Sequence, residues 1–315
     1  MYKKFFNLTK NPFEISPDPY FFYPTKRHLE ALAALSYGIT SNKGFIVITG
    51  DVGTGKTLLA RYLLSYLTRN NISCAYVFNT RLSDIEFLKY IMADWGLPFG
   101  NGKADALLKL NEHLIARFKR GLSTVLIVDE AQDLSWEVME EIRLLTNLET
   151  HQQKLLQIVL VGQEELETML DSVNLRQLKQ RIALRCRLQP LTLEEARDYI
   201  LQRLTRAGAT KSAAQSLFPE PVMAAIYRNA RGIPRLINTI CENALITAFA
   251  GQTRTVTEGM VEEVATDFNL NANPMASPQV PTDLLADQDA ITRLIKLFRS
   301  MDVDQLPGGK KFRPQ

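Results

Sequence analysis

Lys56 and Thr57 end a glycine-rich stretch whose residue types and spacing suit the binding of a phosphate chain. The stretch has the pattern G-x-x-x-x-G-K-T and, with the residue after it, consists of Gly50, Asp51, Val52, Gly53, Thr54, Gly55, Lys56, Thr57 and Leu58. Residues 45–49 predict a buried strand, and residues 58–64 have helical spacing. Between a strand and a helix, glycines let backbone N–H groups converge, and the helix start adds its positive end. We therefore predict that Lys56 binds the phosphates of a nucleoside triphosphate and that Thr57 ligates Mg²⁺.

A second motif with chemical potential is the acidic pair Asp129-Glu130, which follows the apolar run 125–128. Four consecutive apolar residues predict a strand buried on both faces, as parallel sheets require. Ligands of open α/β proteins bind at the carboxyl ends of such strands. We expect Asp129 to orient Mg²⁺ with its waters, and Glu130 to polarise or deprotonate the attacking water. An acidic helix cap would also explain the pair, but the Lys56 motif upstream favours the nucleotide site.

Strands and helices alternate around these two motifs. Helices are predicted over residues 26–41, 83–95, 105–119 and 139–148, and further strands over residues 74–78 and 155–163. Ser83 and Glu86 fit a capping box at the start of one helix. This order predicts an α/β fold: a P-loop NTPase core of three layers with a parallel sheet, over residues 25–190. Its last part carries five basic residues, which we interpret as a solvated basic face: Arg176, Lys179, Arg181, Arg185 and Arg187.

Only helices are predicted in the next segment, residues 191–270, which therefore reads as a small helical lid domain. Thr192 with Glu195 caps a helix over residues 194–207, and Pro221 opens a second helix that ends near residue 231. Two more are predicted over residues 236–249 and 258–267, the last with Thr257 as its cap. Prolines among polar residues indicate a linker over 271–283, followed by a helix over 284–301 and a disordered tail to 315.

Residues 1–24 combine prolines with many aromatic side chains. The prolines argue against a long helix and the aromatic residues argue against a disordered tail, so we predict an extended strap across a domain surface. Two interpretations of its aromatic residues stay open: part of the strap supplies an adenine pocket, or it only packs.

Composition excludes several classes of protein. A net charge of +3 in 315 residues does not by itself argue for nucleic acid or an anionic membrane. The three cysteines are odd in number and lie among apolar residues, which predicts buried free thiols in a reducing compartment. The three histidines have no metal-ligand spacing. With no signal peptide or bilayer-spanning run expected, we predict a cytoplasmic protein.

Taken together, the motifs resemble those of AAA+ ATPases, and more narrowly those of the ExeA/GspA group. That group comprises ATPases of general secretion and of MSHA-type pilus biogenesis, and it is related to the TniB-type transposition ATPases. The likeness covers about residues 1–268. The motifs that carry it are F-x-L with P-F and P-D-P (6–19), G-D-V-G-T-G-K-T (50–57), V-D-E-A-Q (128–132), L-T-N-L-E (145–149), L-V-G-Q-E-E-L (160–166), L-R-Q-L-K-Q-R-I (175–182) and G-I-P-R-L-I-N (232–238).

The resemblance implies roles for further residues. Gln163 is similar to sensor 1, which holds the attacking water near the γ-phosphate, and Arg235 to the sensor 2 arginine, which reports phosphate state within one subunit. Arg181 resembles the finger that reaches the γ-phosphate of a neighbouring subunit, with Arg176 as the second choice. Asn79 resembles the residue that restrains the catalytic glutamate until a partner binds.

The resemblance also implies a Mg²⁺-dependent ATPase that powers or assembles an envelope machine, either a type II-like secretion system or a type IV or MSHA-type pilus. Implied partners are further copies of the chain, with a hexameric ring as one form of a nucleotide-dependent oligomer, and an inner-membrane assembly protein that would hold it peripherally at the membrane. The alternative is a DNA-associated AAA+ regulator of the TniB or initiator type. A helicase is a weak third reading, because other strand-separation motifs are not evident.

Overall fold

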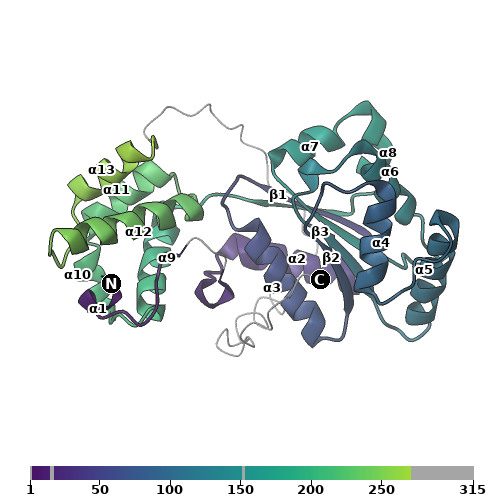
Figure 1. The fold of residues 1–315 in the computed structure, drawn as a ribbon, viewed down its shortest axis with the longest axis horizontal. Helices are drawn as coiled ribbons and strands as arrows, with labels where there is room; N and C mark the ends of the chain where they lie inside the picture. Colours follow the sequence, from purple (N-terminus) through teal and green to yellow (C-terminus); the bar gives the residue numbers. More distant parts are fainter. Residues whose placement is uncertain (1, 15–17, 151–152, 271–315) are drawn as a thin grey trace. The chain divides into compact units, whose positions relative to one another are not determined.

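The computed structural model describes residues 2–14, 18–150 and 153–270. Within them the chain divides into two compact units (Figure 1). The α/β unit consists of Lys26–Val52 and Lys56–Gln189. The helical unit takes Met1–Thr25, Gly53–Gly55 and Pro190–Gln315, as far as these segments are described. The predicted linker 271–283 and the predicted helix 284–301 lie outside the described residues.

Five parallel strands form the sheet of the α/β unit, in the order β2-β3-β4-β1-β5. They are β1 (Phe45–Gly50), β2 (Ser73–Val77), β3 (Thr124–Val128), β4 (Gln157–Val161) and β5 (Leu184–Leu188). Every residue of β1, β3 and β4 is buried, as their uninterrupted apolar runs predict. Because all strands point the same way, the residues that follow β1, β3 and β4 meet at one edge of the sheet, here called the carboxyl edge.

The helices of this unit bury apolar side chains within it. They are α2 (Lys26–Thr40), α3 (Lys56–Arg69), α4 (Asp84–Asp94), α5 (Lys103–Phe118), α6 (Trp136–Leu145), α7 (Glu164–Leu170) and the short α8 (Arg176–Lys179). Helices α2 and α3 pack together, and α4 packs against both α5 and α6 (Figure 1). This unit also has the 3₁₀ turns η2 (Ala131–Asp133) and η3 (Val173–Leu175), and η1 (Pro19–Phe21) belongs to the helical unit.

Local capping explains where two of these helices begin. The capping box at α4 is confirmed, because the Ser83 hydroxyl accepts the N–H of Glu86 and the Glu86 carboxylate accepts the N–H of Ser83. The prediction of a helix over residues 139–148 is wrong at both ends. Ser135 caps α6 through the N–H of Val138, so the helix begins at Trp136, and it ends at Leu145.

Residues 175–187 were interpreted as a solvated basic face, and Arg176, Lys179 and Arg185 are indeed exposed, but strand β5 within this stretch was not predicted. Its sequence alternates apolar and basic residues, and Ile46 of β1 pairs with Leu184 of β5. The basic side chains are also mostly paired: Arg185 with Glu167, Arg187 with Glu164, and Lys179 with Asp171. Their charge is therefore largely neutralised within the unit.

The cysteines follow their prediction only in part. All three are free, and Cys241 is buried, whereas Cys74 and Cys186 are half-buried as residues. Burial raises the pKa of the Cys186 thiol to about 12, so this group stays protonated at neutral pH.

The helical unit contains α1 (Tyr2–Phe5), α9 (Leu193–Arg206), α10 (Lys211–Leu217), α11 (Glu220–Ala230), α12 (Pro234–Ala250) and α13 (Glu258–Asp267). The predicted capping box of Thr192 and Glu195 and the predicted Thr257 cap are confirmed. Helix α10 was not predicted, although Thr210 caps it through the N–H of Ala213.

Aromatic residues of the N-terminal segment complete the core of the helical unit. Phe13 and Phe21 are buried there, and the Phe13 ring meets the Phe218 ring edge-on with centroids 5.8 Å apart. Buried Arg203 donates to the carbonyl oxygen of Pro12 and to the Tyr199 hydroxyl. These contacts support the packing interpretation of the segment, while its part in an adenine pocket stays a prediction.

Candidate functional site

The glycine-rich loop joins β1 to α3 and depends on glycine at two of its positions. Gly53 has φ +82° and Gly55 has φ +96°, values that side chains with a Cβ rarely adopt. A Cβ at Gly53 would also lie 2.8 Å from the Cβ of Arg235 in the same helical unit. The backbone N–H of Arg235 donates to the Gly53 carbonyl oxygen at 3.3 Å. The predicted sensor arginine therefore begins its helix directly against the glycine turn.

The remaining loop residues differ in exposure. Thr54 is buried, whereas Asp51, Thr57 and Leu58 are half-buried and the Val52 side chain is exposed. Desolvation raises the pKa of the Asp51 carboxyl, and nearby Glu164 raises it further. The loop thus offers backbone and small polar groups, with an exposed apolar residue at its tip.

Lys56 is buried at the first turn of α3, with 6% of its surface exposed. Its ammonium donates to the carbonyl oxygens of Gly50 and Asp51, each at 2.8 Å. Burial lowers the pKa of Lys56, and the negative charges of Glu130 and Asp129 act in the opposite direction. No ion pair among the described residues involves Lys56. The ammonium is held by neutral oxygens, which an anion can replace.

Asp129 follows β3 and is 3% exposed. Its Oδ1 accepts the N–H of Glu130 at 3.0 Å, and its Oδ2 accepts the Tyr76 hydroxyl at 2.8 Å. A side-chain hydrogen bond from Thr57 also lowers the pKa of Asp129, although desolvation is the largest influence and raises it. The two predicted Mg²⁺ ligands, Thr57 and Asp129, are therefore in contact.

Glu130 has a left-handed backbone, with φ 52° and ψ 40°, which is uncommon for a residue with a side chain. Its Oε2 accepts Nε2–H from Gln132 at 2.9 Å and from Gln163 at 3.3 Å. The structure thus places the predicted water-activating residue beside the predicted sensor 1 residue. Two neutral amides are its partners.

Asn79 follows β2 and is exposed. Its side-chain oxygen accepts the backbone N–H of Arg81 at 3.2 Å. The side-chain amides that donate to Glu130 come from Gln132 and Gln163 instead. The restraining role of Asn79 stays a prediction.

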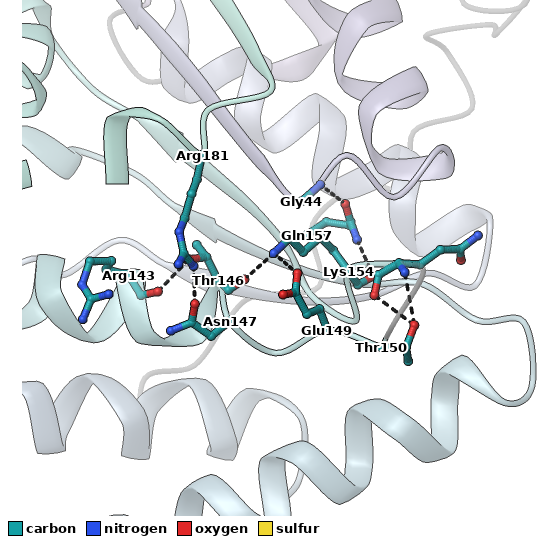
Figure 2. A network of polar contacts seen from close by, with 10 residues as sticks. Gly44, Arg143, Thr146, Asn147, Glu149, Thr150, Lys154, Gln157 and Arg181 are labelled. Atoms are coloured by element: carbon teal, nitrogen blue, oxygen red, sulfur yellow. Dashed lines mark hydrogen bonds and ion pairs between the residues drawn. The ribbon is translucent and has the colours of Figure 1, made fainter. Parts of the chain in front are cut away.

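Arg181 lies at the opposite edge of the sheet, here called the amino edge (Figure 2). It stands two residues before Ala183, whose N–H donates to the carbonyl oxygen of Phe45, the first residue of β1. From Phe45 to Gly50 the strand is about 17 Å long. The guanidinium of Arg181 donates to Thr146 Oγ1 at 2.6 Å and to Asn147. The structure therefore separates Arg181 from the Lys56 of its own chain.

The contacts of Arg181 continue into a wider polar network at the amino edge (Figure 2). Thr146 donates to the carbonyl oxygen of Arg143 at 2.6 Å, and its own carbonyl oxygen accepts Lys154 Nζ at 3.0 Å. Lys154 also pairs with Glu149. Arg176, the second choice for a finger, is exposed and has no side-chain partner within the part of the chain that the structure describes. Of the two arginines, only Arg181 is held in place.

Sequence reasoning missed two residues of this site. Tyr76 is half-buried on the edge strand β2, where an aromatic residue is common and gives no functional signal. Its hydroxyl bonds to Asp129 because Tyr76 pairs with Ile127 of β3. Gln132 lies in the quoted V-D-E-A-Q motif, but its contacts depend on the backbone turn at Glu130.

Comparison with known proteins agrees with this geometry. Residues 39–170 match the AAA domain family. The chain is 43% identical over 270 residues to general secretion pathway protein A of Aeromonas hydrophila, an alignment that covers 84% of this chain and 48% of the relative. The chain belongs to the AAA proteins of the general secretion pathway protein A family. It spans about half the length of that curated relative.

Solved structures show the same fold. The Cdc6p protein of Pyrobaculum aerophilum has a TM-score of 0.59 at 18% identity, covering 79% of this chain and 70% of that chain. The ORC2 protein of Aeropyrum pernix, solved as ADPNP-ADP complexes, has a TM-score of 0.55 at 16% identity, covering 82% of this chain and 71% of that chain. At these identities the likeness establishes the α/β AAA fold. Among the described residues, no helix of this family member is long and apolar enough to cross a bilayer.

Proposed function

We propose that this chain binds ATP with Mg²⁺ and hydrolyses it to ADP and phosphate. One observation carries the proposal: Lys56, the Thr57–Asp129 pair and the Glu130–Gln163 pair gather where β1, β3 and β4 end. They are a cation for phosphate oxygens, two oxygen ligands for a metal, and a carboxylate for a water molecule. The membership in the AAA family supports the same activity.

Binding requires Lys56 to exchange its partners. In the structure its ammonium donates to the carbonyl oxygens of Gly50 and Asp51. A phosphate oxygen carries negative charge, so it adds to the hydrogen bond a direct attraction for the ammonium that a neutral carbonyl oxygen lacks. The exchange is therefore favourable, and it draws the phosphate tail into the turn that Gly53 and Gly55 shape.

The oxygen ligands near Lys56 suit Mg²⁺. Thr57 offers a hydroxyl and Asp129 a carboxylate, and Mg²⁺ in nucleotide sites takes one or two protein oxygens and fills its other positions with phosphates and waters. When bound, Mg²⁺ neutralises charge that develops on the phosphate oxygens. Tyr76 and the Glu130 N–H hold the Asp129 carboxylate in one orientation for this purpose.

Glu130 is the group that takes a proton from the attacking water in this proposal. Gln163 donates to the same carboxylate from the end of β4, so its amide can hold the water and the γ-phosphate in register. Arg235, whose backbone N–H donates to the Gly53 carbonyl oxygen, keeps its predicted role as the sensor 2 arginine in this proposal.

Arg181 acts on a second copy of the chain in this proposal. Its place at the amino edge keeps it from its own phosphate site, and the contacts with Thr146 and Asn147 hold its guanidinium in place. A guanidinium supplied by a neighbour stabilises the charge of phosphoryl transfer. Hydrolysis then depends on assembly into a nucleotide-dependent oligomer, with a hexameric ring as one arrangement.

The role of this ATPase is to power or assemble an envelope machine, a secretion system or a type IV pilus. The name of the Aeromonas hydrophila relative supports the secretion reading. The implied partner is an inner-membrane protein of that machine, which would hold an otherwise cytoplasmic chain at the membrane surface. The alignment covers 48% of that relative, so a contact with the membrane partner needs its own experiment.

The DNA-associated alternative loses its main support in the structure. Basic residues around α8 and β5 prompted it, but Lys179, Arg185 and Arg187 pair with carboxylates. A surface that binds phosphate backbones needs cations free to replace counterions. We therefore retain DNA binding only as an outcome of the test.

The test measures three properties of the purified chain: ATP affinity, phosphate release with Mg²⁺ and with EDTA, and affinity for duplex DNA across a salt series. We expect ATP binding, Mg²⁺-dependent phosphate release, and no salt-dependent DNA binding. In cells, Lys56→Ala is expected to abolish secretion or piliation. A chain that takes up no ATP would overturn the proposal, and DNA affinity that falls steeply with salt would favour the alternative.

A further inference from the structure

Gln132 joins the ends of β3 and β4 through a side-chain carboxamide that makes two contacts of opposite kind. Its Nε2–H donates to Glu130 Oε2 at 2.9 Å, and its Oε1 accepts the backbone N–H of Gln163 at 2.9 Å. Gln163 donates its own Nε2–H to the same Glu130 oxygen at 3.3 Å. The three residues therefore form a closed ring of hydrogen bonds.

The backbone around Gln132 is shaped to fit this ring. Glu130 adopts its left-handed conformation, which is unfavourable for a residue with a Cβ, immediately before η2. At the end of β4, a Cβ on Gly162 would lie only 3.0 Å from Gln132 Oε1 and 2.8 Å from Leu166 Cδ2. The left-handed turn at Glu130 after β3 and the glycine at position 162 after β4 together leave space for the carboxamide of Gln132.

The ring needs a glutamine, because each end of the side chain has a different task. A carboxamide both donates and accepts, whereas a carboxylate only accepts and a thioether does neither to useful strength. Glutamate here would face the Glu130 carboxylate, and methionine would leave the Gln163 N–H without its acceptor. Gln132 has a minor further contact, with Asp133 Oδ2 at 3.3 Å, which does not enter the ring.

We propose that Gln132 is a positioning residue for ATP hydrolysis: it fixes the carboxylate of Glu130 and ties it to Gln163, so that both groups face the water as one unit. This inference rests on the proposed ATPase function. It differs from the predicted role of Asn79, which is to restrain Glu130, because the ring holds the carboxylate for reaction.

The first test compares turnover with binding. In Gln132→Met, which has a side chain of similar length, we expect kcat to fall about 10- to 100-fold, because small displacements of a catalytic group cost about this much. The Kd for ATP should stay within about twofold, since Gln132 itself has no phosphate contact in the proposed site. Gln132→Glu should lose at least as much turnover, and it serves as the second variant if the methionine chain folds poorly. Exposed Gln215 on α10 provides the matched control, Gln215→Met, with unchanged turnover.

A double-mutant cycle separates positioning from a general structural effect. If Gln132 acts through Glu130, then Gln132→Met lowers single-turnover hydrolysis by less than about twofold in a Glu130→Gln chain. An equal fall in both backgrounds would overturn the proposal. So would a Gln132→Met chain whose kcat is unchanged or raised.

A third measurement does not depend on hydrolysis. The Gln163 backbone N–H donates to Gln132, so its hydrogen exchange, followed by NMR on the whole chain, should speed up about tenfold or more in Gln132→Met. Unchanged exchange would show that the ring does not form. If wild type binds ATP without hydrolysing it, both the proposed function and the positioning role are wrong. Faster exchange of the Gln163 N–H in Gln132→Met would still establish the contact between these two residues.

Discussion

The two edges of the five-stranded sheet carry charge in different ways. At the carboxyl ends of β1 and β3, Lys56 donates to carbonyl oxygens, while Asp129 and Glu130 accept from hydroxyl and amide groups. At the amino edge, Lys154 pairs with Glu149 and Arg181 is held by Thr146 and Asn147. In the described part of the chain no ion pair involves Lys56, Asp129 or Glu130.

This difference shows how a fold keeps charge available. A buried charge must be satisfied, but neutral partners satisfy it without cancelling it. Lys56, Asp129 and Glu130 at the carboxyl edge thus stay available to a nucleotide, a metal and a water. At the amino edge, Lys154 and Glu149 form an ion pair with each other, and neutral oxygens hold the guanidinium of Arg181. We expect substitutions at the two edges to differ accordingly.

The largest effect should follow Lys56→Ala. Removing the buried ammonium deprives the phosphates of a charge-assisted partner, which costs about 3 kcal/mol or about 100-fold in ATP affinity. Fluorescent-nucleotide titration measures it, and a thermal melt of the ligand-free chain checks folding. Exposed Lys211 on α10 gives the control, Lys211→Ala, with unchanged affinity. Wild-type affinity in the Lys56 variant would remove the carboxyl edge as the phosphate site.

Glu130→Gln should abolish turnover and leave binding intact. A general base contributes about 10²- to 10⁴-fold, so phosphate release should fall by at least 100-fold while ATP affinity stays within about twofold. We also expect the ATP-bound oligomer to persist, which sedimentation in the presence of ATP detects. Glu137→Gln, an exposed acid at the start of α6, is the matched control. Normal phosphate release from the Glu130 variant would contradict its role.

Arg181→Ala should lower turnover without changing ATP affinity, by about 100-fold or more at concentrations that allow assembly. The decisive measurement mixes this variant with Glu130→Gln. If Arg181 acts on a neighbour, mixed oligomers contain sites with an intact Glu130 and an intact finger, and part of the activity returns. Arg176→Ala, at the exposed second choice, should leave turnover near wild type. A mixture as inactive as its components would argue that Arg181 serves only the network of Figure 2.

The smallest effect is expected for Glu149→Gln at the amino edge. Its ion pair with Lys154 is half exposed, and exposed pairs contribute little to stability. The midpoint of urea unfolding should therefore stay close to that of wild type, and ATP turnover should not change. A large loss of turnover from this substitution would end the distinction between the two edges.

The sequence predicts the carboxyl edge well because local patterns determine it. Residues 45–48 before Thr49 and Gly50 are apolar, Gly53 and Gly55 have φ values that favour glycine, and Asp129-Glu130 follows a second apolar run. The capping residues Ser83, Thr192 and Thr257 act within one helical turn, so they too are legible in the chain. Features that depend on neighbouring residues along the chain are the ones that a single sequence predicts best.

Features that depend on contacts across the sheet escaped prediction. Strand β5 alternates leucine or cysteine with arginine, a pattern of period two that the density of basic residues obscured. The ring around Gln132 requires β3 and β4 to be neighbours, which the order of elements along the chain does not establish. Tyr76 reaches Asp129 only because β2 pairs with β3.

The anchoring of the N-terminal segment has a consequence for how the chain is made. The Tyr2 hydroxyl donates to Glu242 across a sequence separation of 240 residues. At a synthesis rate of about 5–20 residues per second, Tyr2 leaves the ribosome roughly 10–50 s before Glu242 exists. The aromatic side chains near Tyr2 must wait that long for the helices that bury them. These aromatic side chains are therefore open to chaperones well before the helices that bury them have been synthesised.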